Sequence, residues 1–167
     1  MKIQTFLLLC FTSFLWAQPG GPINREAPVT KVPFDRLLRA TQEPQNWLSY
    51  SGGFNSQRHS RLTQITPDNA KDLVLRWVFQ SRSLEKHEVT PLVVDGVMYT
   101  VQSINDVIAL DAATGKTIWT YSHKPDPAAR NCCGQMTRGV AILDDKLFLA
   151  ALDARMIAID AKTGKEL

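Results

Sequence analysis

The sequence predicts an all-β fold of the propeller type, from three observations. After Leu73 the chain becomes a series of short stretches rich in β-branched and aromatic residues, separated by turn sequences. Two of these stretches are repeated further along the chain, and one ungapped shift places Asp111 on Asp160. The shift falls within the period of roughly 40–50 residues, carrying about four strands, that is typical of propeller blades.

The expected strands are short, and tight turns separate them. They cover residues 75–79, 90–94, 97–101, 107–110, 117–121, 140–143, 146–150 and 156–159. The turn signals are Asp95-Gly96, Ala113-Thr114-Gly115, Asp144-Asp145 and Thr163-Gly164.

Each repeat contains the turn Asp-x-x-Thr-Gly-Lys, at 111–116 and again at 160–165. We expect the glycine to take a positive φ and the aspartate to accept hydrogen bonds from the amides of the turn. Trp119 follows the first turn and is expected to pack between neighbouring blades. The second repeat reaches Leu167 before its own tryptophan. Two blades and a lead-in strand cannot close a ring, so we expect a fragment or the product of a broken reading frame.

The part of the chain before Leu73 has a different pattern. Residues 34–40 have helical spacing of their apolar side chains. A second helical turn is expected at 66–69, where Thr66 can cap, Pro67 suits the first position and Asp68 suits the positive end. Between them, residues 47–53 are expected to be extended and to end in a glycine turn.

The N-terminus has the pattern of an export signal. Met1-Lys2 is followed by an apolar run from Ile3 to Trp16 and then by a small residue and helix breakers. We expect a signal peptide at 1–17, an irregular leader at 18–33 and part of a propeller domain at 34–167. From this signal peptide we expect export to the periplasm, without stable insertion in the membrane. A membrane anchor or a buried strand is the alternative, and Cys10 lacks the context of a lipidation site.

Charge and motif patterns exclude several function classes. The net charge is +3 and both signs are mixed along the chain, so no basic stripe indicates nucleic-acid binding. His59, His87 and His123 are too far apart for a local metal signature, and no Cys-x-x-Cys is present. The sequence Thr114-Gly115-Lys116-Thr117 lacks the earlier glycine of a phosphate-binding loop, because Leu110 stands there.

Several segments together resemble the PQQ-dependent alcohol dehydrogenases, which are eight-bladed propellers. The repeat Ala-Leu-Asp-Ala-x-Thr-Gly-Lys-x-x-Trp at 109–119 is similar to their tryptophan-docking repeat. Residues 47–65 resemble their lead-in sequence, and 88–99 resemble their first-blade motif. The most specific part is Asn131-Cys132-Cys133-Gly134 followed by Arg138-Gly139. The resemblance implies an all-β fold made of the N-terminal blades of an eight-bladed propeller, incomplete in this chain.

The resemblance assigns cofactor-binding roles to Glu88, Cys132, Cys133 and Arg138. It implies a disulfide between Cys132 and Cys133. Because adjacent Cα atoms lie closer than a normal bridge spans, that disulfide would close a strained, flat ring. That ring would pack on planar PQQ, Arg138 would hold the PQQ oxygens and Glu88 would hydrogen-bond its edge. The alternatives are an inert or a reactive free cysteine pair, a surface ion pair at Arg138, and a solvated carboxylate at Glu88.

The reaction implied by the resemblance is oxidation of a small alcohol to an aldehyde. PQQ would accept hydride with calcium or a lanthanide in the full-length enzyme, an aspartate would act as base, and cytochrome c would take the electrons. No catalytic residue or metal ligand of the family can be placed in this chain. One alternative is a cofactor-free propeller scaffold of the outer-membrane assembly type, and another is a non-functional remnant.

Overall fold

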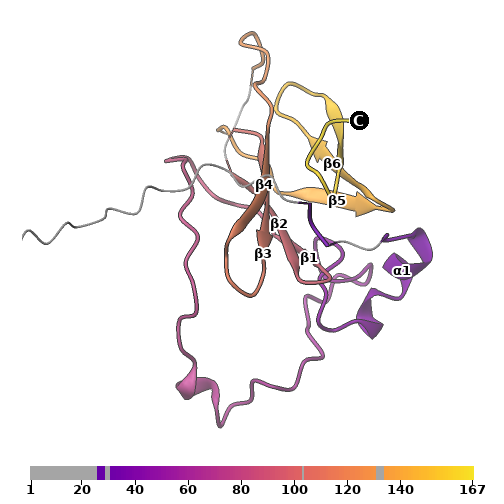
Figure 1. Cartoon of the computed structure of the whole chain (residues 1–167), viewed down its shortest axis with the longest axis vertical. Helices are drawn as coiled ribbons and strands as arrows, with labels where there is room; N and C mark the ends of the chain where they lie inside the picture. The colour runs from indigo at the N-terminus through magenta and orange to yellow at the C-terminus, as the bar shows by residue number, and fades with distance from the viewer. Residues whose placement is uncertain (1–25, 29–30, 103, 131–133) are drawn as a thin grey trace, which may run out of the picture.

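The computed structural model describes residues 26–28, 31–102, 104–130 and 134–167. Two antiparallel sheets form the body of the molecule (Figure 1). The first contains β1 to β4 in sequence order, and the second contains β5 to β7. Their bounds are β1 Leu92–Val94, β2 Val97–Gln102, β3 Asp106–Asp111, β4 Thr117–Ser122, β5 Val140–Leu143, β6 Lys146–Ala150 and β7 Met156–Asp160. The strand predictions from residue 90 onward are confirmed to within two residues at either end.

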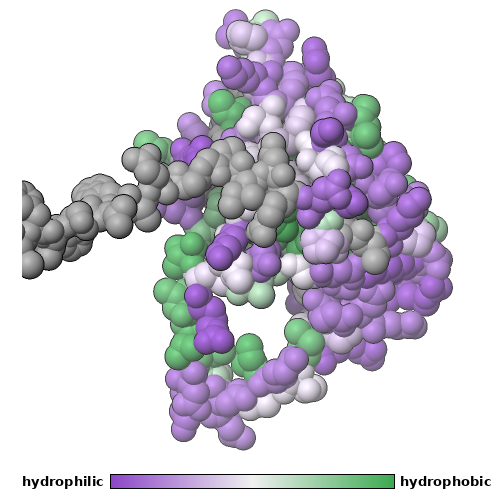
Figure 2. Space-filling view, in the orientation of Figure 1, coloured by the Kyte–Doolittle hydropathy of each residue, from purple (hydrophilic) through white to green (hydrophobic). Residues whose placement is uncertain are grey.

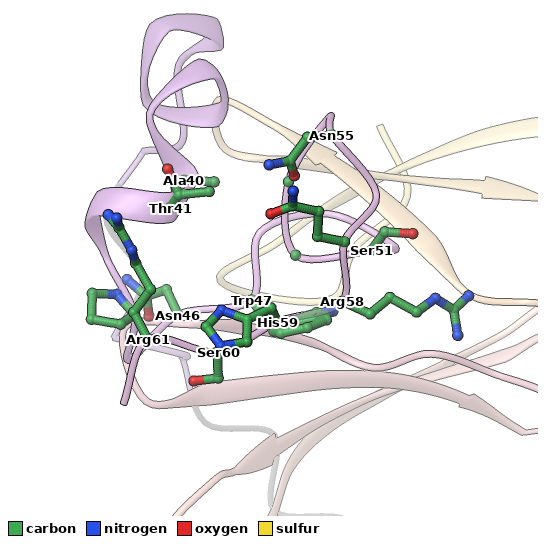
Figure 3. A pocket seen from close by; sticks show the side chains of 14 residues that line it. Ala40, Thr41, Asn46, Trp47, Ser51, Asn55, Arg58, His59, Ser60 and Arg61 are labelled. Carbon is green, nitrogen blue, oxygen red and sulfur yellow. The ribbon is translucent and has the colours of Figure 1, made fainter. Parts of the chain in front are cut away.

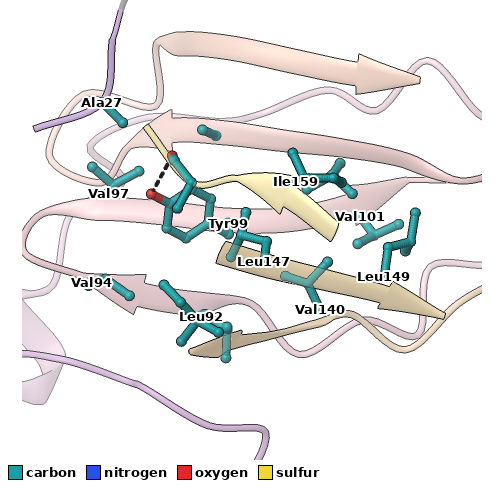
Figure 4. Close-up of a cluster of buried hydrophobic side chains, with 14 of the residues drawn as sticks. Ala27, Leu92, Val94, Val97, Tyr99, Val101, Val140, Leu147, Leu149 and Ile159 are labelled. Carbon is teal, nitrogen blue, oxygen red and sulfur yellow. Dashed lines mark hydrogen bonds between the residues drawn. The ribbon is translucent and has the colours of Figure 1, made fainter. Parts of the chain in front are cut away.

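The core of the molecule lies between these two blade sheets. Figure 4 shows Tyr99 and Val101 of β2 facing Leu147 and Leu149 of β6, with Ile159 of β7 beside them. All five side chains are buried. Burying a large apolar side chain contributes about 1.5–3 kcal/mol, so this shared layer is what holds the two blades together.

Trp119 makes the contact between blades that the sequence predicts. Its ring lies over Gly164, where an added Cβ would come within 2.6 Å of the ring. Its indole N–H donates to the Ala161 carbonyl at 3.3 Å. The turn itself is closed by Asp160, whose carboxylate accepts hydrogen bonds from the backbone N–H and the hydroxyl of Thr163 at 2.7 and 2.8 Å. The tryptophan of one blade is therefore fixed on the Asp-x-x-Thr-Gly turn of the next.

Trp77 makes the same contact with the first blade, a role that the repeat pattern does not predict. Its ring lies within 2.5 Å of an added Cβ on Gly115, and its indole N–H donates to the Ala112 carbonyl at 3.1 Å. The strand expected at 75–79 is not formed. Residues 74–80 form no backbone hydrogen bond within the described part of the chain. The expectation was wrong because an apolar β-type pattern needs a neighbouring strand, and here only the tryptophan is anchored.

The segment before the first blade begins with a short helix, as predicted. Helix α1 spans Phe34–Leu38 and the 3-10 helix η1 spans Ala40–Gln42. Arg36 of α1 contacts the carboxylates of Glu43 and Asp95, each at 2.7 Å. Because Asp95 lies in the β1–β2 turn, this arginine joins the helix to the first blade.

One further expectation about the N-terminal part needs correction. The turn at 67–69 continues into the 3-10 helix η2, Ala70–Asp72, whose N-cap position is occupied by Asn69 and not by Thr66. The carboxamide of Asn69 instead accepts a hydrogen bond from the Thr66 amide at 2.7 Å. In the described part of the leader, Val32 and Asp144 exchange backbone hydrogen bonds at 2.8 and 2.7 Å. The boundaries of the expected signal peptide lie outside the described residues.

Candidate functional site

Glu88 and Arg138, the two predicted site residues that the structure describes, lie side by side. Glu88 precedes β1 and Arg138 precedes β5, so each stands near the start of the first strand of its blade. The Thr90 amide donates to the Arg138 carbonyl at 3.3 Å. Beside it, Gly139 has φ 127°, and an added Cβ there would lie 3.1 Å from the Thr90 carbonyl oxygen. A side chain at 139 would therefore push the two segments apart.

The two side chains form a loose, open ion pair. Arg138 Nη2 lies 3.5 Å from a Glu88 carboxylate oxygen, and the side chains are 74% and 40% exposed. An exposed pair of this kind contributes at most about 1 kcal/mol to stability. Both groups keep most of their hydrogen-bonding capacity, so the pair is suited to receiving a ligand more than to holding the fold together.

Three residues that no sequence motif assigns to this site also belong to it: Tyr50, Arg58 and Thr90. The Arg58 guanidinium stacks on the Tyr50 ring, 4.9 Å from its centroid. Interaction with Arg58, and then with the Thr90 side chain, lowers the pKa of the Tyr50 hydroxyl, and the charge of Arg138 acts in the same direction. Two guanidinium groups thus act on one phenol.

Only spatial proximity identifies these added residues. Tyr50 belongs to the Trp-x-x-Tyr stretch of the lead-in sequence, and Arg58 lies eight residues later along it. Neither spacing indicates a contact with the start of β1 or β5. Cys132 and Cys133 lie outside the described residues, so the predicted disulfide stays a prediction.

A cavity of about 170 Å³ lies next to this site, in the lead-in sequence. Figure 3 shows Trp47 and His59 close together in its wall, while the Arg58 side chain extends away from them. Trp47 packs on Gly52, whose φ is +80°. Neither Glu88 nor Arg138 lines this cavity. Arg58 is shared, because it contributes to the cavity wall and also stacks on Tyr50.

A second charged group lies where the crossover between the blades begins. His123 Nε2 lies 2.9 Å from Asp153 Oδ2, and the side chains are 13% and 4% exposed. The pKa of Asp153 is lowered, chiefly by His123, which keeps its carboxylate ionised.

Within the described residues, no group of three His, Cys, Asp or Glu side chains could hold a metal ion. Among the same residues, no helix has the length and apolar character needed to cross a bilayer.

Comparison with known proteins gives one consistent family. Residues 47–167 match the family model described as the PQQ glucose/ethanol/alcohol dehydrogenase β-propeller domain. A quinohemoprotein alcohol dehydrogenase from Comamonas testosteroni is 39% identical over 153 residues, which cover 90% of this chain and 22% of that protein. A 1-butanol dehydrogenase (cytochrome c) from Thauera butanivorans is 46% identical over 121 residues, covering 71% of this chain and 18% of that protein.

Solved structures show the same likeness. The quinohemoprotein alcohol dehydrogenase ADHIIG from Pseudomonas putida superposes with a TM-score of 0.72 at 38% identity, over 87% of this chain and 20% of that one. A europium-containing methanol dehydrogenase superposes with a TM-score of 0.74 at 36% identity, over 80% of this chain and 24% of that one. The chain spans about a fifth of the length of the curated relatives that it matches.

Proposed function

Because this chain belongs to the PQQ-dependent glucose/ethanol/alcohol dehydrogenase family, as part of its β-propeller domain, we propose that it supplies one wall of a PQQ site. The complete protein would oxidise a small alcohol to an aldehyde and pass the electrons to cytochrome c. The names of the relatives support this reaction, since they include alcohol dehydrogenases and one whose name carries cytochrome c. The N-terminal apolar run supports export to the periplasm.

The observation that carries the proposal is the contact between Glu88 and Arg138. The two residues are 50 positions apart in sequence, yet the starts of β1 and β5 bring their side chains to 3.5 Å. Tyr50 and Arg58 join them from the lead-in sequence. A ligand at this place meets two guanidinium groups, one phenol and one carboxylate.

The chemistry of these donors fits PQQ, which carries three carboxylates. Guanidinium groups bind carboxylates through paired N–H donors, and such charge-assisted hydrogen bonds are about twice as strong as neutral ones. Arg138 would bind a carboxylate of the cofactor, and Glu88 would accept a hydrogen bond from a protonated edge group. Calcium or a lanthanide would be held by residues that we do not assign to this chain. When bound, PQQ supplies the hydride-accepting carbonyl; the residues described here orient the cofactor.

The test is PQQ binding by the complete protein with and without Arg138. We expect Arg138→Ala to weaken PQQ binding at least about tenfold, because it removes a charge-assisted contact of roughly 1.5–3 kcal/mol. The free energy of unfolding should change by less than about 1 kcal/mol, since the ion pair is exposed. Arg39→Ala is the matched control, because Arg39 is also exposed and pairs only with Asp35 in the contacts seen here.

Two outcomes would contradict the proposal. If Arg138→Ala and Arg39→Ala bind PQQ as tightly as the wild type, Arg138 is not a cofactor residue. If the wild type binds no PQQ in the presence of calcium or a lanthanide, a cofactor-free propeller scaffold becomes the better assignment.

A further inference from the structure

The crossover between the two blades runs from His123 to Gly139 and carries Arg138 near its end. Its far end is fixed at the proposed cofactor site, where the Arg138 carbonyl accepts a hydrogen bond from the Thr90 amide at 3.3 Å. Binding residues keep their geometry when the segments that carry them are supported by packing and hydrogen bonds. The contacts that fix the beginning of the crossover therefore bear on the geometry of the cofactor site.

One carboxylate oxygen holds the beginning of this crossover. Oδ2 of Asp153 lies 2.9 Å from His123 Nε2 and accepts a hydrogen bond from the Asp126 amide at 3.3 Å. Pro125 and Pro127 flank Asp126 and have no amide of their own. The Asp126 side chain also accepts a hydrogen bond from the Ala128 amide at 2.8 Å. A side chain and a backbone amide of the crossover thus meet at one atom.

Asp153 is itself held in a rigid setting. It lies in the β6–β7 turn, where the Ala151 amide donates to the Arg155 carbonyl at 2.9 Å. The next amide, of Leu152, donates to the Asn105 side chain at 3.2 Å, and Asn105 is fully buried in the first blade. The Asp153 side chain is only 4% exposed. Burying a carboxylate costs free energy unless it is paired, so the hydrogen bonds of Asp153 offset the cost of its burial.

Resting on the proposed function, we infer that Asp153 is a positioning residue for the cofactor site. From the second blade it holds the first turn of the crossover, through His123 and the Asp126 amide, and so limits where Arg138 can lie. Asp153 does not touch the cofactor in this proposal. The two contacts that anchor the crossover are those of Asp153 with residues 123–126 and of the Thr90 amide with the Arg138 carbonyl.

The test compares Asp153→Asn with Glu166→Gln in the complete protein. Glu166 is a matched control because its carboxylate also joins the blades, accepting a hydrogen bond from the Tyr121 hydroxyl at 2.5 Å, but it does not touch the crossover in the contacts seen here. In Asp153→Asn we expect faster hydrogen exchange at the Asp126 amide and PQQ binding weakened on the order of tenfold. The kcat at saturating PQQ and the KM for the alcohol should stay unchanged. Glu166→Gln should change neither the exchange nor the PQQ affinity.

His123 variants supply a second test should Asp153→Asn fail to fold. His123→Ala removes the side-chain contact and should weaken PQQ binding, whereas His123→Gln keeps a donor for Asp153 and should restore it. Equal exchange at Asp126 in the wild type and Asp153→Asn would overturn the inference, as would equal PQQ affinity. So would an equal loss of PQQ affinity in Glu166→Gln. A wild type that binds no PQQ would instead contradict the proposed function. Failure of the proposed function can therefore be distinguished from failure of the inference about Asp153.

Discussion

The three tyrosines of the chain lie in three environments that move their pKa values in different directions. Arg58 is the main cause of the lowered pKa of Tyr50. Burial is the main cause of the raised pKa of Tyr99, whose hydroxyl donates to the Ala161 carbonyl at 2.9 Å. Burial also raises the pKa of Tyr121, and its hydrogen bond to Glu166 adds to that effect. One phenol therefore belongs to the candidate site and two belong to the blade contacts.

We expect the tyrosinate absorbance band to develop in separate steps as the pH rises. Tyr50 should titrate first, below the usual pKa near 10, and Tyr50→Phe should remove that step. Arg58→Ala should move the step to higher pH. Since the folded-state pKa of Tyr99 lies above its unfolded value, its contribution to stability is complete below about pH 10 and is lost as the pH rises further. A single step shared by all three tyrosines would contradict these environments.

Residue patterns predicted side-chain contacts only where the two partners are close in sequence. The Asp-x-x-Thr-Gly turns could be predicted, because each carboxylate bonds amides a few residues away, as Asp111 does with Thr114 at 2.9 Å. Glu88 and Arg138 were found through a family resemblance. The stacking of Arg58 on Tyr50 could not be predicted, because the two residues are eight positions apart in a segment without regular secondary structure.

At the scale of single elements, Arg36 decides how helix α1 joins the first blade. Its guanidinium also lies within hydrogen-bonding distance of the second Asp95 oxygen, at 3.2 Å. The Asn46 side chain donates to Glu43 at 2.7 Å, and the Asp95 amide donates back to Asn46 at 2.9 Å. The helix could be predicted from its apolar spacing. The arginine could not, since its two partners belong to different segments.

We expect Arg36→Ala to lower the free energy of unfolding by about 2 kcal/mol. Breaking a buried pair costs roughly 3–5 kcal/mol, and the cost is smaller here because the carboxylates are partly exposed. Arg36 is the main cause of the lowered pKa of Glu43. Its stabilisation is therefore present above the unfolded pKa, near 4.3, and is lost as the pH falls further. Urea unfolding at neutral and acidic pH measures this difference, which should shrink in acid.

The tryptophan contacts between blades can be tested with a pair of glycines. Gly96 and Gly164 both have positive φ, of +82° and +73°, but an added Cβ meets nothing within 4 Å at Gly96 and lies 2.6 Å from the Trp119 ring at Gly164. Gly96→Ala should cost only the backbone strain, about 1–2 kcal/mol. Gly164→Ala should cost that amount plus the displacement of Trp119, with a shift in tryptophan fluorescence. Equal losses in thermal or urea unfolding would show that the ring is not held on this turn.

At the scale of the whole molecule, the arrangement of the tryptophans defines where blades begin and end. Trp119 ends the first blade and rests on the second. Trp77 rests on the first blade in the same way, so we interpret residues 73–80 as the counterpart of the last strand of a preceding blade, although they form no strand here. Periodicity predicted the repeat from residue 94 onward. It could not place this segment, because the described chain contains no earlier copy to compare with it.

The segment 73–80 should therefore behave as an unprotected strand edge in the isolated chain. Leu75 and Val78 are 80% and 73% exposed. Figure 2 shows apolar side chains on the surface of the extended segment that stands out from the two sheets. An exposed apolar edge with unpaired backbone groups is a template for pairing with another strand. In the complete propeller a strand from elsewhere would cover it; in the isolated chain a second copy would.

We accordingly expect the isolated chain to self-associate with increasing concentration in sedimentation velocity experiments. Val78→Lys should shift the equilibrium toward monomer, because a lysine on an exposed edge opposes strand pairing, while Trp77 stays docked on Gly115. Leu38→Lys is the control: Leu38 is 59% exposed but lies on α1, away from the edge. If wild type and both variants are monomeric at all concentrations, the edge does not recruit a strand. If Leu38→Lys dissociates the chain as well as Val78→Lys, general hydrophobic contact explains the association better than strand pairing at 73–80.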